Sequence, residues 1–128
     1  MKNLFWITCL FILAIWGTSC SYDYITFNQE PVDTLDTVYF AGEIEPIFYE
    51  NNNCTACHKA GGVKFDLSMG NAYNSIISNQ LVDTANPESS PLYDFPNPAT
   101  SKHSWKKYTV PQAQLVLRWI KQGAMNNK

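Results

Sequence analysis

Residues 51–62 read NNNCTACHKAGG and place Cys54, Cys57 and His58 within five positions. Two thiols three positions apart can lie together on one helical turn, with the histidine directly after them. The chain has 128 residues and four cysteines, and the other two, Cys9 and Cys20, lie close to the N-terminus. What the folded part of this chain does therefore depends on what this stretch binds.

The first twenty residues, MKNLFWITCLFILAIWGTSC, have the pattern of an export signal. Lys2 precedes an apolar run from Leu4 to Trp16 that is too short to span a bilayer comfortably. The small residues before Cys20 resemble the lipobox of bacterial lipoproteins, although Gly17 stands where that motif usually has leucine. We expect a signal peptide over residues 1–19 and a lipid on Cys20, which would anchor the protein at the cell envelope. An ordinary secretory signal is the alternative.

The region after Cys20 predicts a tether followed by one domain. Residues 20–40 are polar and have no sustained period, so we expect a lipid-anchored tether there. Residues 41–128 are enough for one small domain. In the alternative, Val38 to Phe40 already belong to that domain. The net charge of −2 and the exported location argue against a nucleic-acid partner.

The cysteine positions leave this domain without a structural disulfide. Cys9 lies in the signal peptide, and Cys20 is the lipid site, so Cys54 and Cys57 have no further cysteine to pair with. Exported small domains commonly use disulfides for stability. We therefore expect something else to stabilise this one.

The fold is predicted to be all-α, with three to five short helices and long loops, because no run of residues has a strand pattern. Ile44, Ile47 and Phe48 share one face of a first helix. Pro46 is tolerated only in the first turn, so this helix should begin near Glu43 and end at the three asparagines. A short middle helix is predicted in residues 70–78, with four inward residues: Ala72, Tyr73, Ile76 and Ile77.

The last helix has the clearest pattern. Thr109 and Gln112 form a capping box, Pro111 sits in the first turn, and Gly123 follows the last turn. A stripe of helical period runs through Ala113, Val116, Leu117, Ile120 and Ala124. Leu115 and Trp119 lie off that stripe, so a second face must be covered by protein or by something else. The proline-rich loop before this helix allows one helical turn around Ser89 to Asp94.

Cys-x-x-Cys-His is the attachment motif of c-type haem. The two thiols reach the two vinyl groups of the porphyrin and form thioethers, and the following histidine can bind the iron as proximal ligand. One covalent haem would also give a large apolar body to a chain without a sufficient core of its own. Cys54, Cys57 and His58 are therefore the candidate cofactor-binding residues.

Three other interpretations of the motif stay open. A zinc site needs four ligands, which only His58 and His103 could complete. A thioredoxin-like redox pair would need a strand before the motif. The third is a chance occurrence.

Four stretches of the chain resemble the small single-haem cytochrome c-like domains of bacterial exported proteins. They are IEPIF at 44–48, CTACHKAGG at 54–62, NPESSPLY at 86–93 and WIKQGAMNN at 119–127. The resemblance implies a cytochrome c-like fold with a haem pocket between the first and last helices. It also implies a second axial ligand from the loop before the last helix.

That loop departs from the family pattern, in which methionine and proline supply the distal ligand. It reads TSKHSWKKYTVPQ over residues 100–112 and contains no methionine. His103 falls close to the expected position and is the only histidine besides His58, so we predict bis-histidine coordination. Met69, Met125 and an open five-coordinate iron are the alternatives.

A six-coordinate iron favours an electron carrier over an enzyme, and two histidines favour a lower potential than a histidine–methionine pair. We expect electron exchange with redox partner proteins at the cell envelope. One alternative is a haem-based sensor or small haem enzyme with an open distal site, and another is a surface lipoprotein without haem. Three lysines and two interleaved aromatic residues around His103 suggest a basic docking patch or an ordinary solvated loop: Lys102, Trp105, Lys106, Lys107 and Tyr108.

Overall fold

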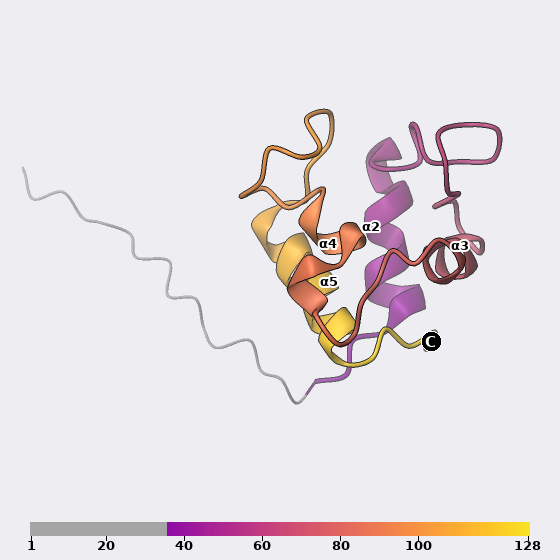
Figure 1. Cartoon of the computed structure of the whole chain (residues 1–128). Helices are drawn as coiled ribbons and strands as arrows, with labels where there is room; N and C mark the ends of the chain where they lie inside the picture. Colours follow the sequence, from indigo (N-terminus) through magenta and orange to yellow (C-terminus); the bar gives the residue numbers. More distant parts are fainter. Residues whose placement is uncertain (1–35) are drawn as a thin grey trace, which may run out of the picture. The chain divides into compact units, whose positions relative to one another are not determined.

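The computed structural model describes residues 36–128, and every regular element in that range is helical (Figure 1). The elements are η1 (Phe40–Ile44), α2 (Glu45–Tyr49), η2 (Glu50–Asn52), α3 (Ala72–Ser78), η3 (Pro87–Ser89), α4 (Pro91–Asp94) and α5 (Val110–Lys121). The prediction of short helices joined by long loops is confirmed for these residues. The predicted signal peptide, the lipid site Cys20 and the tether up to residue 35 lie outside the described residues. Between residues 36 and 128, no helix is long and apolar enough to cross a membrane.

The first helix begins earlier than predicted, because a π-helical turn precedes its α-helical part. In η1 the N–H of Glu45 donates to the carbonyl of Phe40, and the chain then continues directly into α2. Pro46 lies in the first turn of α2, as predicted, where its missing N–H costs little. A proline ring inside a regular α-helix clashes with the carbonyl four residues before it, which favours a wider turn at this position.

The packed domain also begins before the predicted boundary at residue 41. Val38 and Phe40 are only 1% and 2% exposed. The N–H of Val38 donates to Gln122 Oε1 (2.9 Å), and that of Phe40 donates to Asn127 Oδ1 (2.7 Å). Asn127 Nδ2 in turn donates to the carbonyl of Val38 (3.0 Å). The alternative in which Val38 to Phe40 belong to the domain therefore holds. We call these contacts the terminal clasp.

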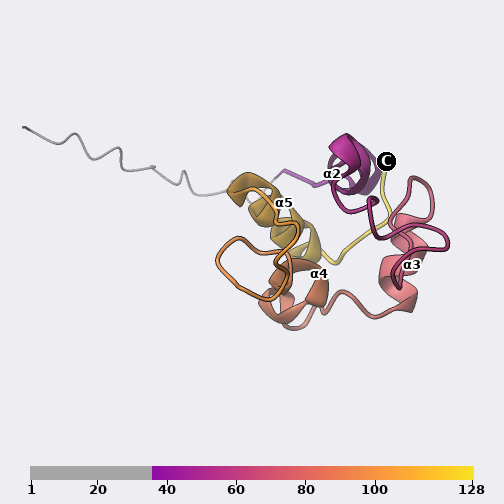
Figure 2. The same ribbon diagram turned by 90° about the horizontal axis from the view of Figure 1, so that it is seen from above.

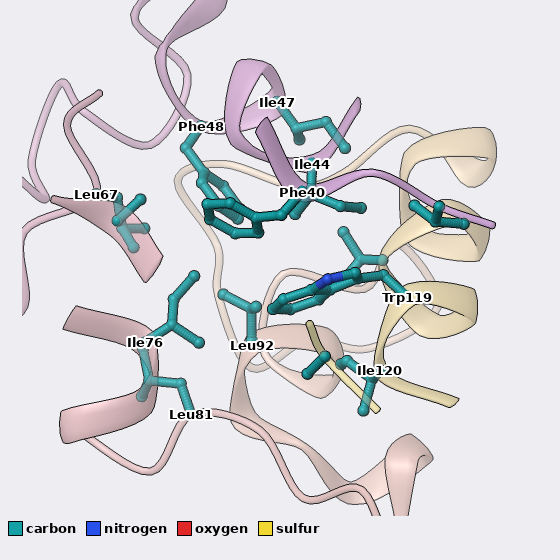
Figure 3. Packing of buried hydrophobic residues seen from close by; sticks show 14 of the residues in the cluster. Phe40, Ile44, Ile47, Phe48, Leu67, Ile76, Leu81, Leu92, Trp119 and Ile120 are labelled. Carbon is teal, nitrogen blue, oxygen red and sulfur yellow. The ribbon is translucent and has the colours of Figure 1, made fainter. Parts of the chain in front are cut away.

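An aromatic cluster joins η1, α3 and α5. Trp119 is 1% exposed, and its ring centre lies 5.3 Å from that of Phe40 and 6.5 Å from that of Tyr73. Figure 3 shows the indole projecting from α5 towards Phe40. Its Nε1 donates to the carbonyl of Met125 (2.9 Å). At Trp119, the second face of the last helix is thus covered by protein.

The helix α5 has the predicted caps. The N–H of Gln112 donates to Thr109 Oγ1 (3.3 Å), and the N–H of Thr109 donates to Gln112 Oε1 (2.9 Å). Gly123 ends the helix with φ of +97°, in the left-handed region that glycine adopts freely. Both ends of the helix therefore form where the sequence predicted them.

The middle helix buries a narrower face than predicted. Ala72 and Ile76 of α3 are fully buried, and Tyr73 donates its hydroxyl to the carbonyl of Ala124 (3.1 Å). Ile77, predicted to point inward, is 43% exposed. A helix of two turns contacts the core along one i, i+4 line, and Ile77 lies about 100° around the axis from Ile76. Figure 1 shows α2 between α3 and the pair formed by α4 and α5, and Figure 2, seen from above, shows these three parts at the corners of a triangle.

Candidate functional site

The end of the first helix fixes the start of the Cys-x-x-Cys-His stretch. Asn51 has φ of +54°, a left-handed conformation that asparagine tolerates better than most residues. The chain then turns back, and the N–H groups of Cys54 and Thr55 both donate to the carbonyl of Phe48, at 2.8 and 3.1 Å. This carbonyl would otherwise be unpaired at the helix end. The helix therefore sets where the first cysteine lies.

The two cysteines and the histidine share one helical turn. The N–H groups of Cys57 and His58 donate to the carbonyl of Cys54, at 3.1 and 2.8 Å. Neither thiol is in a disulfide; Cys57 is exposed, and Cys54 is half-buried against the core. Burial raises the pKa of the Cys54 thiol to about 11, and the nearby Lys106 ammonium lowers it by less. Thioredoxin-like cysteine pairs have a lowered pKa instead, so Cys54 does not have their electrostatic setting.

The imidazole of His58 is held in one orientation. Its Nδ1 lies 3.0 Å from the carbonyl oxygen of Lys64. Because a carbonyl can only accept, Nδ1 carries the proton, and Nε2 of the neutral ring is left to bind a metal. The ring also stacks on Phe65, with ring centres 4.3 Å apart and planes within 4°. Metal-binding histidines are commonly fixed by such a bond from their second nitrogen.

A tight turn after the motif brings Lys64 to this position. The N–H of Gly62 donates to the carbonyl of Lys59 (2.8 Å), and that of Val63 donates to the carbonyl of Cys57 (2.9 Å). A Cβ atom on Gly62 would lie 2.3 Å from the Cys57 carbonyl oxygen. Only glycine fits there, so the second glycine of KAGG is required by the turn itself.

His103, in the loop between α4 and α5, is held in the same way. Its Nδ1 lies 2.7 Å from the carbonyl oxygen of Lys106, so Nδ1 is the donor and Nε2 of the neutral ring would be left to bind a metal. Its ring centre is 6.3 Å from that of His58. Two imidazoles that bind one metal ion from opposite sides through single nitrogens lie about 6 Å apart between centres, since each metal–nitrogen bond is about 2 Å. The two histidines therefore have a spacing that fits one shared metal ion.

Both cysteines and both histidines line one cavity of about 790 Å³. This volume lies in the range of about 300–1,000 Å³ that is usual for cofactor and ligand sites. Core residues form its inner wall: Leu67, Leu81, Leu92 and Tyr108. Exposed apolar residues stand at its rim: Val63, Phe95 and Trp105. Lys64, Lys106 and Lys107 also line it, without any carboxylate among the lining residues.

The methionine alternatives lie elsewhere. The exposed fractions of Met69 and Met125 are 65% and 51%, and neither residue lines the cavity. The zinc interpretation finds no support in the part of the chain that the structure describes. No group of three or more His, Cys, Asp or Glu side chains there could hold a metal ion.

The residues of the predicted basic patch have different surroundings. Lys102 pairs with the carboxylate of Asp94, and the ammonium of Lys107 donates to backbone carbonyls. Trp105 is 89% exposed, whereas Tyr108 is a core residue whose hydroxyl donates to the carbonyl of Leu92. Burial raises the pKa of Tyr108 well above its usual range, and the negative charge of a Cys54 thiolate would raise it further. Of the two aromatic residues in this loop, Trp105 alone is available to a partner.

Several residues of the site were not found from the sequence. Phe65 stacks on His58 with a left-handed backbone (φ of +59°), a conformation for which a phenylalanine gives no sequence signal. Leu67 and Leu81 lie outside helices, so no helical period marked them as cavity residues. Comparison of the chain with protein-family models, with curated proteins and with solved structures found no match.

Proposed function

We propose that this domain is an electron-transfer cytochrome c-like domain with one haem attached to Cys54 and Cys57. The observation that carries the proposal is the 6.3 Å spacing of the His58 and His103 rings beside both thiols in one apolar cavity. His58 would be the proximal ligand and His103 the distal ligand. A bound haem supplies a one-electron iron couple, and the chain supplies its ligands, its burial and its surface.

The ligand residues favour a closed iron with a low potential. Each histidine donates a hydrogen bond from Nδ1 to a backbone carbonyl, so each ring is oriented before a metal binds. Among the described residues that line the cavity there is no methionine, and imidazole in place of a thioether removes the ligand that raises the potential. If both histidines bind the metal, no open position would remain on it for a substrate, which favours electron transfer over catalysis.

The cysteine chemistry also favours attachment over a redox role. Cys54 has a raised pKa and is therefore a neutral thiol at physiological pH, not the thiolate that a disulfide-exchange enzyme needs. Cys57, three residues after Cys54, lines the same cavity and is more exposed to solvent. Two thiols at different depths on one wall suit two bonds to one large apolar body.

The cavity rim would let electrons leave the site. Val63, Phe95 and Trp105 combine an exposed surface with a place in the cavity lining. We propose that redox partner proteins meet the domain at this rim. We further propose that a lipid on Cys20 anchors the protein at the cell envelope.

Absorption and magnetic circular dichroism spectra of oxidised and reduced protein test the proposal. The protein should be produced in a host that attaches c-type haem, as wild type and as His103→Ala. We expect a low-spin bis-imidazole spectrum for wild type and a high-spin spectrum for His103→Ala. Met69→Ala and Met125→Ala are matched controls, because both side chains lie away from the cavity, and both variants should retain the wild-type spectrum.

Other results would reject parts of this assignment. A high-spin wild type that binds carbon monoxide rapidly would favour the sensor or enzyme with an open distal side. A sulfur-to-iron charge-transfer band that disappears in one methionine variant would move the distal ligand to that residue. Protein that contains no iron, from a host proven to attach haem to a control cytochrome, would reject the haem proposal.

A further inference from the structure

The ammonium of Lys107 holds together the loop that carries His103. Its Nζ donates to the carbonyl of Thr100 at 2.7 Å, and to the carbonyls of Asn97 and Phe95 at 3.2 and 3.3 Å. The side chain is half-buried and forms no salt bridge among residues 36–128. We call these three contacts the Lys107 clamp. Thr100 Oγ1 also lies 3.3 Å from this nitrogen, so the three protons of the ammonium have four acceptors within reach.

The segment bound by the clamp is attached to the core. Thr100 Oγ1 donates to the carbonyl of Asp94 (3.0 Å), at the end of α4. The N–H of Tyr108 donates to the carbonyl of Pro96 (2.9 Å), and the buried Tyr108 hydroxyl binds the carbonyl of Leu92. Because Lys107 directly precedes the core residue Tyr108, it links the loop to the core.

His103 lies inside the loop that the clamp closes. The contact between Thr100 and Lys107 joins the two sides of the segment 100–107. Within it, the Nδ1 of His103 donates to the carbonyl of Lys106, the residue directly before the clamping lysine. A movement of Lys107 would therefore shift the carbonyl that orients the imidazole.

We propose that Lys107 is the positioning residue that keeps His103 beside His58, and that it thereby sets how often the distal side opens. The part of this inference that concerns ligand binding at the metal rests on the proposed function. Hydrogen bonds from a charged donor are stronger than neutral ones. Without the ammonium the Thr100 carbonyl loses its donor, and the carbonyls of Phe95 and Asn97 keep only their contacts with Thr100. The closed loop would then regain conformational freedom.

Carbon monoxide binding to the reduced holoprotein measures this opening. A ligand that needs the open state binds with an apparent affinity that is proportional to the fraction of open protein. For Lys107→Met we expect the apparent affinity to rise at least about tenfold. The loss of one hydrogen bond from a charged group changes an equilibrium constant by about tenfold or more. Lys107→Arg keeps the charge and the donors and should fall between wild type and Lys107→Met.

Lys102→Met is the matched control. It removes the same charge from the same loop, next to His103, but its ammonium pairs with Asp94 at an exposed site. Exposed ion pairs contribute little, so its carbon monoxide affinity should stay within about twofold of wild type. Thr100→Val is a second test variant, which removes a hydroxyl of the clamped segment and should shift the affinity in the same direction by less.

Hydrogen exchange of the same proteins separates this inference from the haem proposal. Lys107→Met should exchange faster in peptides from residues 95–107 and unchanged in peptides from α5. Equal carbon monoxide affinity and equal exchange in wild type and Lys107→Met would overturn the role of Lys107. If wild type contains no haem, the proposed function fails, and exchange in residues 95–107 still decides whether Lys107 orders this loop. If Lys107→Met does not fold, Thr100→Val and Lys107→Arg decide by the same two measurements.

Discussion

Gly62→Ala should strongly destabilise this domain, although it adds a single methyl group. The added Cβ would lie 2.3 Å from the carbonyl oxygen of Cys57 and 3.1 Å from that of Lys59. Both atoms belong to the backbone, so no side chain can turn away to make room. The Cys57 carbonyl would have to move, and it would lose its hydrogen bond from the N–H of Val63 (2.9 Å).

The two effects give the magnitude. Overpacking costs about 1–3 kcal/mol, and a lost internal hydrogen bond costs about 1 kcal/mol. We therefore expect the free energy of unfolding to fall by about 2–4 kcal/mol. Urea unfolding of the purified protein, followed by far-ultraviolet circular dichroism, should show a midpoint lowered by about 1–2 M at an unchanged slope.

Two other glycines provide the controls. A Cβ on Gly42, in η1, would meet no atom within 4 Å, so Gly42→Ala should be neutral or stabilise by up to about 1 kcal/mol. Gly61 also has open space but a φ of +73°, so Gly61→Ala should cost about 1–2 kcal/mol from backbone strain alone. If Gly62→Ala unfolds at the wild-type midpoint, or at that of Gly42→Ala, the close approach at Cys57 is not a constraint and the reasoning fails.

Three further changes test other parts of the structure. Asn127→Ala removes two of the three bonds of the terminal clasp and should lower the free energy of unfolding by about 1–3 kcal/mol in urea, whereas the exposed neighbour Asn126→Ala should stay within about 0.5 kcal/mol of wild type. Thr109→Ala removes the cap of α5 and should cost about 1 kcal/mol, with Thr109→Ser close to wild type; equal midpoints for all three proteins would contradict the capping role. Tyr108→Phe leaves the carbonyl of Leu92 without its donor and should cost about 1–3 kcal/mol. Because the pKa of Tyr108 is raised in the folded state, its contribution to stability is present below about pH 10 and is lost as the pH rises above that value. The midpoint of wild type should therefore fall more steeply than that of Tyr108→Phe between pH 9 and about 11.

Local patterns predicted the helices where cap and period agree. Thr109, Gln112 and Gly123 define both ends of α5 through contacts within a few residues, so the sequence alone contains them. The boundary of the domain was less visible, because Val38 and Phe40 are paired by Gln122 and Asn127 from the far end of the chain. Ile77 was misplaced for a related reason: how much of a short helix is buried depends on its neighbours, not on its own period.

The candidate site also contains parts that the sequence predicts and parts that it does not. The motif of Cys54, Cys57 and His58 is local, and the structure forms it on one turn. That His103 lies near His58 was predicted from a resemblance, since nothing in the spacing of residues determines a contact between two loops. The carbonyls of Lys64 and Lys106, which orient the two rings, have no sequence signal, because every residue has a carbonyl. Backbone partners of this kind become visible only when the chain is folded.

The terminal clasp also has a mechanical consequence. Figure 1 shows the described chain starting and ending at the lower edge, far from the loops at the upper edge that carry the two histidines. A force that pulls on the chain before residue 36 would act first on the bonds to Gln122 and Asn127. That load would pass into the end of α5 and the core around Trp119 before it reached α2 and the turn that holds His58. A domain held by its N-terminal side could therefore be pulled, turned or bent at its attachment while the spacing of its two imidazoles stayed the same.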